Sequence, residues 1–475
     1  MTKQTSGAPE TGFKLNVKRT MLIGFAFFGI LLMWQVYDGW CPAFLSDMFC
    51  RAFGYDITDP AQSKQVQYLV GIVMAMDNLA ALILMPIFGH LSDKTHTKIG
   101  KRMPFILTGT FVCAIAMPFI PLLFHLNNII GVISMMAIVL LFGMMYRNPA
   151  VALMPDITPK PLRSRANGLI NVMGYFGGAV ATVLGMFLVV SKYIKDPSNP
   201  QYHNLWVIET PFLLASVLMV ASALVLFFTI KENKLEEELR DEMARGEEMA
   251  AIEEKIVDDD QPLSKANRRM LFLILGAEFF WFMAENGVST FLANYAMSYL
   301  GTDTAKTSMC TLIGGICSVV GFVLGGLIAS KIGRKWTLWG GLALTLASYA
   351  VWTILTFTFA PNGTMPIYVY VVFAAKGFGM SLVHINSFPM VVELCSKKKI
   401  GAFTGYYYAS SMAAQTVTPI VLGSLLLIPN FSWRIVPAYA MVCLLISTII
   451  FVFVKNVKTE KTKIAKGLEA LGQED

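Results

Sequence analysis

Long apolar runs recur along the whole chain and restrict what it can fold into. Each run holds roughly 20 residues, which as a helix crosses about 30 Å of bilayer hydrocarbon. Only helices and closed barrels satisfy their backbone groups in lipid, and the alternating segments of about ten residues that a barrel needs are absent. The sequence therefore predicts an all-α membrane protein with about twelve transmembrane helices. We place the spans near residues 20–45, 66–88, 103–124, 129–147, 166–190, 206–230, 270–297, 308–330, 336–357, 365–390, 401–427 and 432–454.

Composition and charge agree with this class. Of the 475 residues, 55% are hydrophobic and 15% are charged, whereas a soluble domain carries about 25% charged residues. The net charge of +7 does not indicate a nucleic-acid partner, because the bases mark the ends of the spans. Loops on one side carry most of these bases, among them Lys98, Lys160, Lys331 and Lys398. This asymmetry predicts a multi-pass protein of the cytoplasmic (inner) cell membrane, surrounded by lipid, with both termini cytoplasmic.

An acidic polar segment, residues 231–269, interrupts the spans near the middle of the chain. It separates an N-terminal bundle, residues 1–230, from a C-terminal bundle, residues 270–475, with about six spans each. Leu235, Leu239 and Met243 recur every four residues, which predicts a surface helix within the segment. We interpret the segment as a solvated cytoplasmic linker, and a regulatory role is the alternative.

Two charged loops occupy equivalent places in the two halves. The first, Gly89–Arg102, reads G-H-L-S-D-K-T-H-T-K-I-G-K-R, and a weaker copy, Gly326–Lys335, reads G-L-I-A-S-K-I-G-R-K and lacks the acid. The first loop resembles the loop between helices two and three of the major facilitator superfamily, and the second resembles its C-terminal copy. The resemblance implies two six-helix bundles with a binding site between them at the middle of the bilayer.

We expect the loop charges to form a clasp that stabilises one face of the transporter in its closed state. Glycines allow close approach of helix ends, and acids and bases bind helix termini of opposite dipole sign. A hairpin that only sets topology is the alternative. The residues expected to act in gating are Gly89, Asp93, Lys94, Gly100, Lys101, Arg102, Arg147, Asp156, Arg163, Gly333 and Arg334.

The segment Arg147–Gly174 and the stretch Asn386–Glu393 resemble the sucrose- and maltose-type proton symporters and the related glycoside–pentoside–hexuronide cation symporters. Asp156, Arg163 and Asn167 match those families by position. The resemblance implies a cation-coupled carrier of a sugar or glycoside. We place Arg147 near the cytoplasmic end of its span, where two roles stay open: an ion pair with Asp93 or Asp156, or contact with substrate.

Polar side chains within the spans are the candidate binding residues, because each is costly in lipid unless it is paired or hydrated. Amides and carboxylates beside aromatic rings supply what a sugar needs, namely hydrogen-bond partners for its hydroxyls and flat surfaces for its C–H faces. The predicted substrate-binding residues are Trp34, Gln35, Asp38, Asn286, Lys376, Asn386 and Gln415.

Carboxyl groups within the spans are the candidates for proton coupling. We predict this role for Asp77, Glu285 and Glu278, and structural ion pairs between helices are the alternative. Lys376 is the expected partner of these acids, and His384 is interpreted as a packed, hydrogen-bonded residue. The melibiose permease branch binds sodium through two acids that precede a P-x-x-G, but Ala81 and Met85 stand at those positions here. We therefore expect H⁺ as the coupling ion, with no metal and no other cofactor.

The sequence thus predicts a monomeric secondary active transporter that takes up a sugar or glycoside with a proton by alternating access. One alternative is an exporter or exchanger of another small polar or anionic solute, with Lys376 as its anchor. A membrane sensor that kept the fold but lost transport is another. An enzyme is not expected, because no nucleophile–base, metal or phosphate-cradling motif is found.

Overall fold

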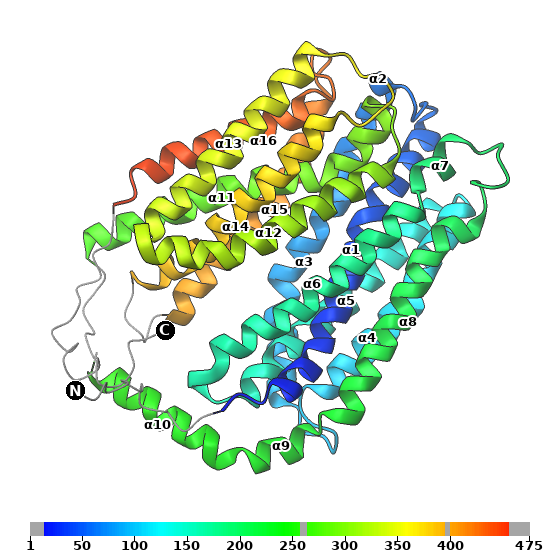
Figure 1. The fold of residues 1–475 in the computed structure, drawn as a ribbon. Coiled ribbons are helices and arrows are strands. Elements are labelled where there is room, and N and C mark those ends of the chain that lie inside the picture. Colours follow the sequence, from blue (N-terminus) through cyan, green and yellow to red (C-terminus); the bar gives the residue numbers. More distant parts are fainter. Residues whose placement is uncertain (1–13, 257–263, 395–399, 456–475) are drawn as a thin grey trace, which may run out of the picture.

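The computed structural model describes residues 14–256, 264–394 and 400–455. Within these ranges the chain is helical, without a strand, and 12 helices are long and apolar enough to cross a membrane. They form two bundles that lie side by side (Figure 1). The all-α fold with twelve spans that the sequence predicts is confirmed.

Each bundle has its own apolar core. The N-terminal bundle consists of α1 (Val17–Phe53), α3 (Gln67–Lys94), α4 (Met103–His125), α5 (Ile129–Asp156), α6 (Arg163–Phe187) and α8 (Leu205–Thr229), with the short helices α2 (Pro60–Ser63) and α7 (Val190–Lys195). The C-terminal bundle consists of α11 (Lys265–Asn294), α12 (Thr304–Ile332), α13 (Arg334–Thr358), α14 (Ile367–Val392), α15 (Ile400–Leu426) and α16 (Ile435–Val452).

Three helices extend beyond their predicted ends. The sequence places the ends of α1, α3 and α5 near residues 45, 88 and 147, but α1 continues to Phe53, α3 to residue 94 and α5 to Asp156. Hydropathy marks where a helix leaves the hydrocarbon, whereas helical hydrogen bonding continues wherever side chains support it. On α1, an ion pair between Asp47 and Arg51, one turn apart, supports the added turns.

Between the bundles, the linker forms α9 (Glu232–Glu238) and α10 (Arg240–Ile256). Leu239 is buried in the N-terminal core, and Leu235 and Met243 pack against that core, which confirms the predicted surface helix. One residue near the start of the segment departs from the interpretation as a solvated linker, because Glu232 is only 1% exposed. We call the end of the molecule that carries α9 and α10 the linker end, and the opposite end, with α2 and α7, the far end (Figure 1).

The two bundles are joined at the far end. Asn294 of α11 donates to Gln67 Oε1 of α3 at 3.0 Å, and the indole of Trp433 donates to the carbonyl of Pro60 at 3.2 Å. Lys64 reaches across to the carbonyl of Ile428 at 3.1 Å. Toward the linker end the bundles diverge (Figure 1). The structure is therefore a conformation sealed at the far end.

Candidate functional site

Three cavities adjoin one another between the bundles. The first, which we call the Asp77 cavity, has a volume of about 310 Å³. A bridging cavity of about 330 Å³ shares Asp38 and Ser289 with it. The third, the Glu285 cavity, measures about 380 Å³ and shares Gln35 and Lys376 with the bridging cavity. Predicted residues of both bundles are thus brought together along one continuous set of cavities.

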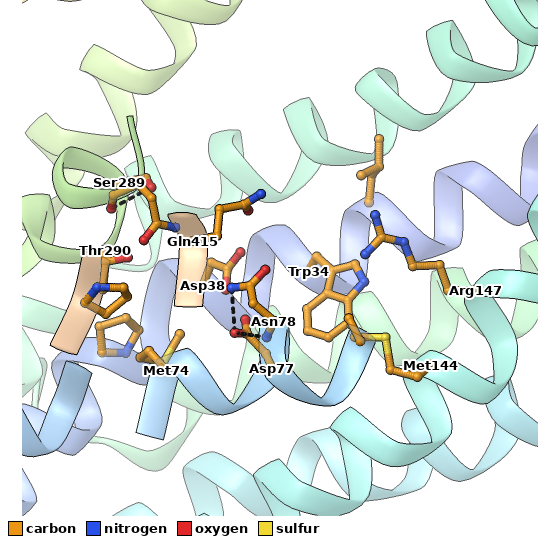
Figure 2. A pocket seen from close by; sticks show the side chains of 15 residues that line it. Trp34, Asp38, Met74, Asp77, Asn78, Met144, Arg147, Ser289, Thr290 and Gln415 are labelled. Carbon is orange, nitrogen blue, oxygen red and sulfur yellow. Dashed lines mark hydrogen bonds between the residues drawn. The ribbon is translucent and has the colours of Figure 1, made fainter. Parts of the chain in front are cut away.

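The Asp77 cavity presents polar groups from both bundles (Figure 2). Asp77 of α3 accepts from the backbone N–H of Asn78 at 2.6 Å and from its side-chain amide at 2.8 Å. Asp38 of α1 lines the same cavity, as do the predicted substrate-binding residues Trp34, Asn286 and Gln415.

Two polar atoms of this cavity lack a hydrogen-bond partner within the described ranges. They are the indole Nε1 of Trp34 and the side-chain oxygen of Asn286, both buried. A buried donor or acceptor without a partner costs about 1–3 kcal/mol. Both atoms are closed off in this conformation, so a ligand reaches them only if the side chains turn. The cavity is also lined by the polar side chains of Asp38, Asp77 and Gln415. The cavity is therefore suited to a hydroxylated molecule beside an aromatic ring.

The Glu285 cavity contains an ion-paired cluster. Glu285 of α11 binds the ammonium of Lys376 at 3.1 Å through one oxygen and the ring Nε2 of His384 at 2.8 Å through the other. Lys376 and His384 lie two turns apart on α14, so both face the same carboxylate. The predicted pairing of Lys376 with one of the candidate acids is confirmed for Glu285. His384 is hydrogen-bonded, as expected, but its partner is a candidate coupling carboxylate and it lines the cavity.

Two predicted residues lie away from these cavities. Glu278 is fully buried, and neither carboxylate oxygen has a partner in the part of the chain that the structure describes. The carbonyls of its neighbours Leu275 and Ala277 accept hydroxyl hydrogen bonds from α15 and α16, which places this stretch of α11 inside the C-terminal bundle. Asn386 is 2% exposed and donates to Leu382 O of its own helix. Helical spacing predicts which residues share a face but not what covers that face.

Arg147 lies at a different place from the one that the sequence predicts. Because α5 continues to Asp156, Arg147 lies inside the helix and lines the Asp77 cavity rather than the charged loop. The ion pairs considered for it are not formed, since Asp93 and Asp156 both bind Arg102 instead. We therefore group Arg147 with the cavity residues.

The remaining loop charges form a cluster at the linker end of the N-terminal bundle. Arg102, at the start of α4, binds Asp93, Ser92 and Asp156, the last at 2.8 Å through Nε. Lys101 adds a contact of 3.3 Å to Asp156. These bonds tie the ends of α3, α4 and α5 to one another within one bundle. A role in gating stays a prediction.

Three other predicted gating residues lie near the same ends of α3 and α5. Gly89 allows α3 to approach α5, because a Cβ there would collide with the amide of Asn148. Lys94 is the last residue of α3. Arg163 donates to the carbonyl of Pro155 at 2.9 Å, near the end of α5.

The C-terminal copy of the loop has an acidic partner after all. Arg334, at the start of α13, forms an ion pair with Glu393 at the end of α14. The loop itself lacks an acid, as the sequence indicates, but a residue distant in sequence supplies one. The two bundles therefore carry comparable charge pairs at the same end.

Glu232 is a structural residue that the sequence interpretation missed. Its carboxylate accepts from the backbone N–H groups of Lys101, Arg102 and Met103 at 3.0–3.1 Å, and so caps the start of α4. Burial raises the pKa of Glu232, whereas these donors act in the opposite direction. The sequence carries one indication of this role. The residue before α4 is Arg102, whose side chain cannot accept a hydrogen bond, so the first N–H groups of α4 need an acceptor from another segment.

Gly100 allows Glu232 to reach this position. Its φ is +120°, and a Cβ there would overlap the Glu232 carboxylate. We expect Gly100→Ala to lower the midpoint of thermal unfolding in detergent by more than Gly333→Ala does. Gly333 also has a positive φ, of +90°, but a Cβ there meets no atom within 4 Å. Both variants carry the backbone strain of about 1–2 kcal/mol, and only Gly100→Ala also displaces the cap. Equal shifts would contradict the proposed cap.

The solved structures include a close match in fold. The inward-open conformation of the xylose transporter XylE from Escherichia coli superposes with a TM-score of 0.68, over 96% of this chain and 99% of that chain. The sequence identity is 14%, so this likeness shows the fold alone.

Curated relatives match over shorter stretches. The probable galactarate/D-glucarate transporter GarP of Escherichia coli K12 is 27% identical over 168 residues, which are 34% of this chain and 36% of GarP. Lactose permease of Leuconostoc lactis is 22% identical over 272 residues, 54% of this chain and 39% of that protein. The alignments thus span less than half of either relative.

The family itself follows from a longer match. The sequence profile described as Major Facilitator Superfamily aligns with residues 26–360 and, in a second alignment, with residues 274–472. These alignments cover both bundles and the charged loops at their linker ends. The chain therefore belongs to the Major Facilitator Superfamily.

Proposed function

We propose that this protein is a secondary active transporter that moves a sugar or sugar derivative together with protons by alternating access. The observation that carries the proposal is that polar side chains of both bundles line the Asp77 cavity, among them Trp34 of α1 and Asn286 of α11. A solute bound to both would contact both halves of the carrier. The relatives support the substrate class, because their names refer to lactose and to the sugar acids galactarate and glucarate.

Two groups of carboxyls would take part in proton coupling, one in the Asp77 cavity and one in the Glu285 cavity. In the Asp77 cavity, Asp77 and Asp38 line an open volume, from which a proton can reach either carboxyl and leave it. In the Glu285 cavity, Glu285 can exchange partners between Lys376, His384 and a proton. We place the linker end in the cytoplasm, so the described conformation faces inward, and we propose that the carrier acts as a monomer in the cytoplasmic membrane.

A carrier that exports or exchanges an acidic solute is the second candidate. The similarity to GarP favours an acidic solute, since galactarate and glucarate are dicarboxylates, and leaves the direction of transport to the experiment. From the sequence, Lys376 is the expected anchor for such a substrate. That ammonium already binds Glu285 at 3.1 Å, so a substrate carboxylate would have to displace it.

Asp77→Asn tests the coupling. In proteoliposomes, addition of a transported sugar should drive proton influx in the wild type. Asp77→Asn should lose this influx and keep exchange of labelled sugar against internal sugar, because amide and carboxylic acid have the same shape but only the acid releases a proton. Asp241→Asn, on the exposed face of α10, is the matched control and should behave as wild type. Sugar uptake by the wild type without any proton movement would contradict symport.

A further inference from the structure

We propose that the transported sugar carries a carboxylate and that Arg147 binds it. The inference deepens the proposed function and rests on it. Besides His384, two basic side chains line the three cavities, namely Arg147 and Lys376. Lys376 is neutralised by Glu285. Arg147 forms no hydrogen bond or ion pair with any residue that the structure describes.

The position of Arg147 leaves its donors available to a ligand. In Figure 2 the ring of Trp34 lies between Arg147 and Asp77, and no bond joins the guanidinium to Asp77 or Asp38. An arginine keeps its charge in any protein environment, and at membrane depth it requires water or a counter-ion. Its planar fork of N–H donors matches the two oxygens of a carboxylate. The Asp77 cavity therefore offers an anion a charged partner that no protein carboxylate occupies.

The neighbours of Arg147 suit the rest of a sugar acid. The Trp34 ring lines the cavity and offers an apolar face to the C–H side of a sugar. Asn286 and Gln415, from the C-terminal bundle, can bind hydroxyls of the same molecule. A sugar acid held between Arg147 and these groups would contact both bundles.

The charge balance of the cavity links the anion to the proton. With Asp38 and Asp77 ionised and Arg147 charged, the cavity carries one net negative charge and repels an anion. When a proton neutralises one carboxyl, the charge of Arg147 becomes available to the substrate carboxylate. A sugar acid therefore binds most tightly to the protonated carrier, and the two move together.

Matched pairs of sugar derivatives test the inference. The probes are D-glucuronate, D-galacturonate, D-gluconate and D-galactonate, each compared with its neutral amide, which has the same hydroxyls. Counterflow in proteoliposomes measures their affinity. We expect the carrier to bind at least one acid with about tenfold higher affinity than its amide. Arg147→Gln should lower the affinity for that acid about 100-fold and change the affinity for the amide little. Arg147→Lys should recover part of the loss, because it restores the charge but not the fork. Arg269→Gln, at the exposed start of α11, is the control and should match the wild type.

The outcomes separate this inference from the proposed function. Proton influx driven by neutral sugars but by none of the acids would contradict the proposal that the substrate carries a carboxylate. It would be consistent with symport of a neutral sugar. Acid transport that is unchanged in Arg147→Gln would overturn the role of Arg147. No proton influx and no counterflow with any neutral sugar or acid would overturn both the inference and the proposed function.

Discussion

Glu285→Gln should abolish proton-driven accumulation of substrate in proteoliposomes. The substitution removes the one carboxylate that binds both Lys376 at 3.1 Å and His384 at 2.8 Å. It leaves the lysine ammonium without its partner in a cavity between bundles, a change that costs about 3–5 kcal/mol when a buried pair is broken. The ratio of internal to external substrate should fall to one. Asp47→Asn, which breaks an ion pair on α1 at the far end, is the control and should keep accumulation.

A double variant separates coupling from structural pairing. Glu285→Gln combined with Lys376→Met also removes the ammonium that the single variant leaves unpaired. The midpoint of thermal unfolding of the double variant should therefore return most of the way to the wild-type value. Accumulation should stay absent, because no titrating carboxyl has been restored. If the double variant regained uphill transport, Glu285 would be a structural partner of Lys376 and the coupling role would be wrong.

Lys64→Met should open the far end of the carrier. The Lys64 side chain is 6% exposed, and its ammonium donates to the carbonyls of Ile428, Pro429 and Phe431 in the turn between α15 and α16. Hydrogen bonds to charged groups contribute about 1.5–3 kcal/mol each. Loss of even one such contribution shifts the equilibrium between far-end-closed and far-end-open states by about tenfold or more.

Distances between spin labels would measure this shift. With labels at Tyr55 of the N-terminal bundle and Asn362 of the C-terminal bundle, both exposed, the long-distance population should grow in Lys64→Met. Lys192→Met is the matched control, because Lys192 also reaches the other bundle but pairs with Asp303 at 3.9 Å in an exposed position. Exposed pairs of this kind contribute little. An unchanged distance distribution in Lys64→Met would show that the other far-end contacts suffice to hold the seal.

The fold could be predicted because it depends on local patterns. Apolar runs long enough to span a bilayer predict helices whatever surrounds them, and the base-rich loops predict which ends lie together. Within the spans, a charged or amide side chain predicts a cavity or an ion pair, and Asp77, Asn286 and Glu285 do line cavities. Each of these inferences uses only a short window of sequence.

The partners of these side chains could not be predicted, because packing between distant segments decides them. Glu278 and Glu285 lie on nearly one face of α11, yet only Glu285 reaches a cavity, since α15 and α16 cover the other. Arg334 finds Glu393 across many intervening residues. The sequence places Arg147 at the end of its span because hydropathy falls there, whereas the helix continues to Asp156.

The cap that Glu232 places on α4 has a consequence for synthesis at the ribosome. Helix α4 is exposed to the bilayer early, but its first N–H groups gain their acceptor only after α8 has been completed and residue 232 has emerged. The acceptor nevertheless arrives before any residue of the C-terminal bundle. Because domains fold as units, with the N-terminal one first during synthesis, the first half of this carrier acquires a finished set of helix ends while the second half is still being translated.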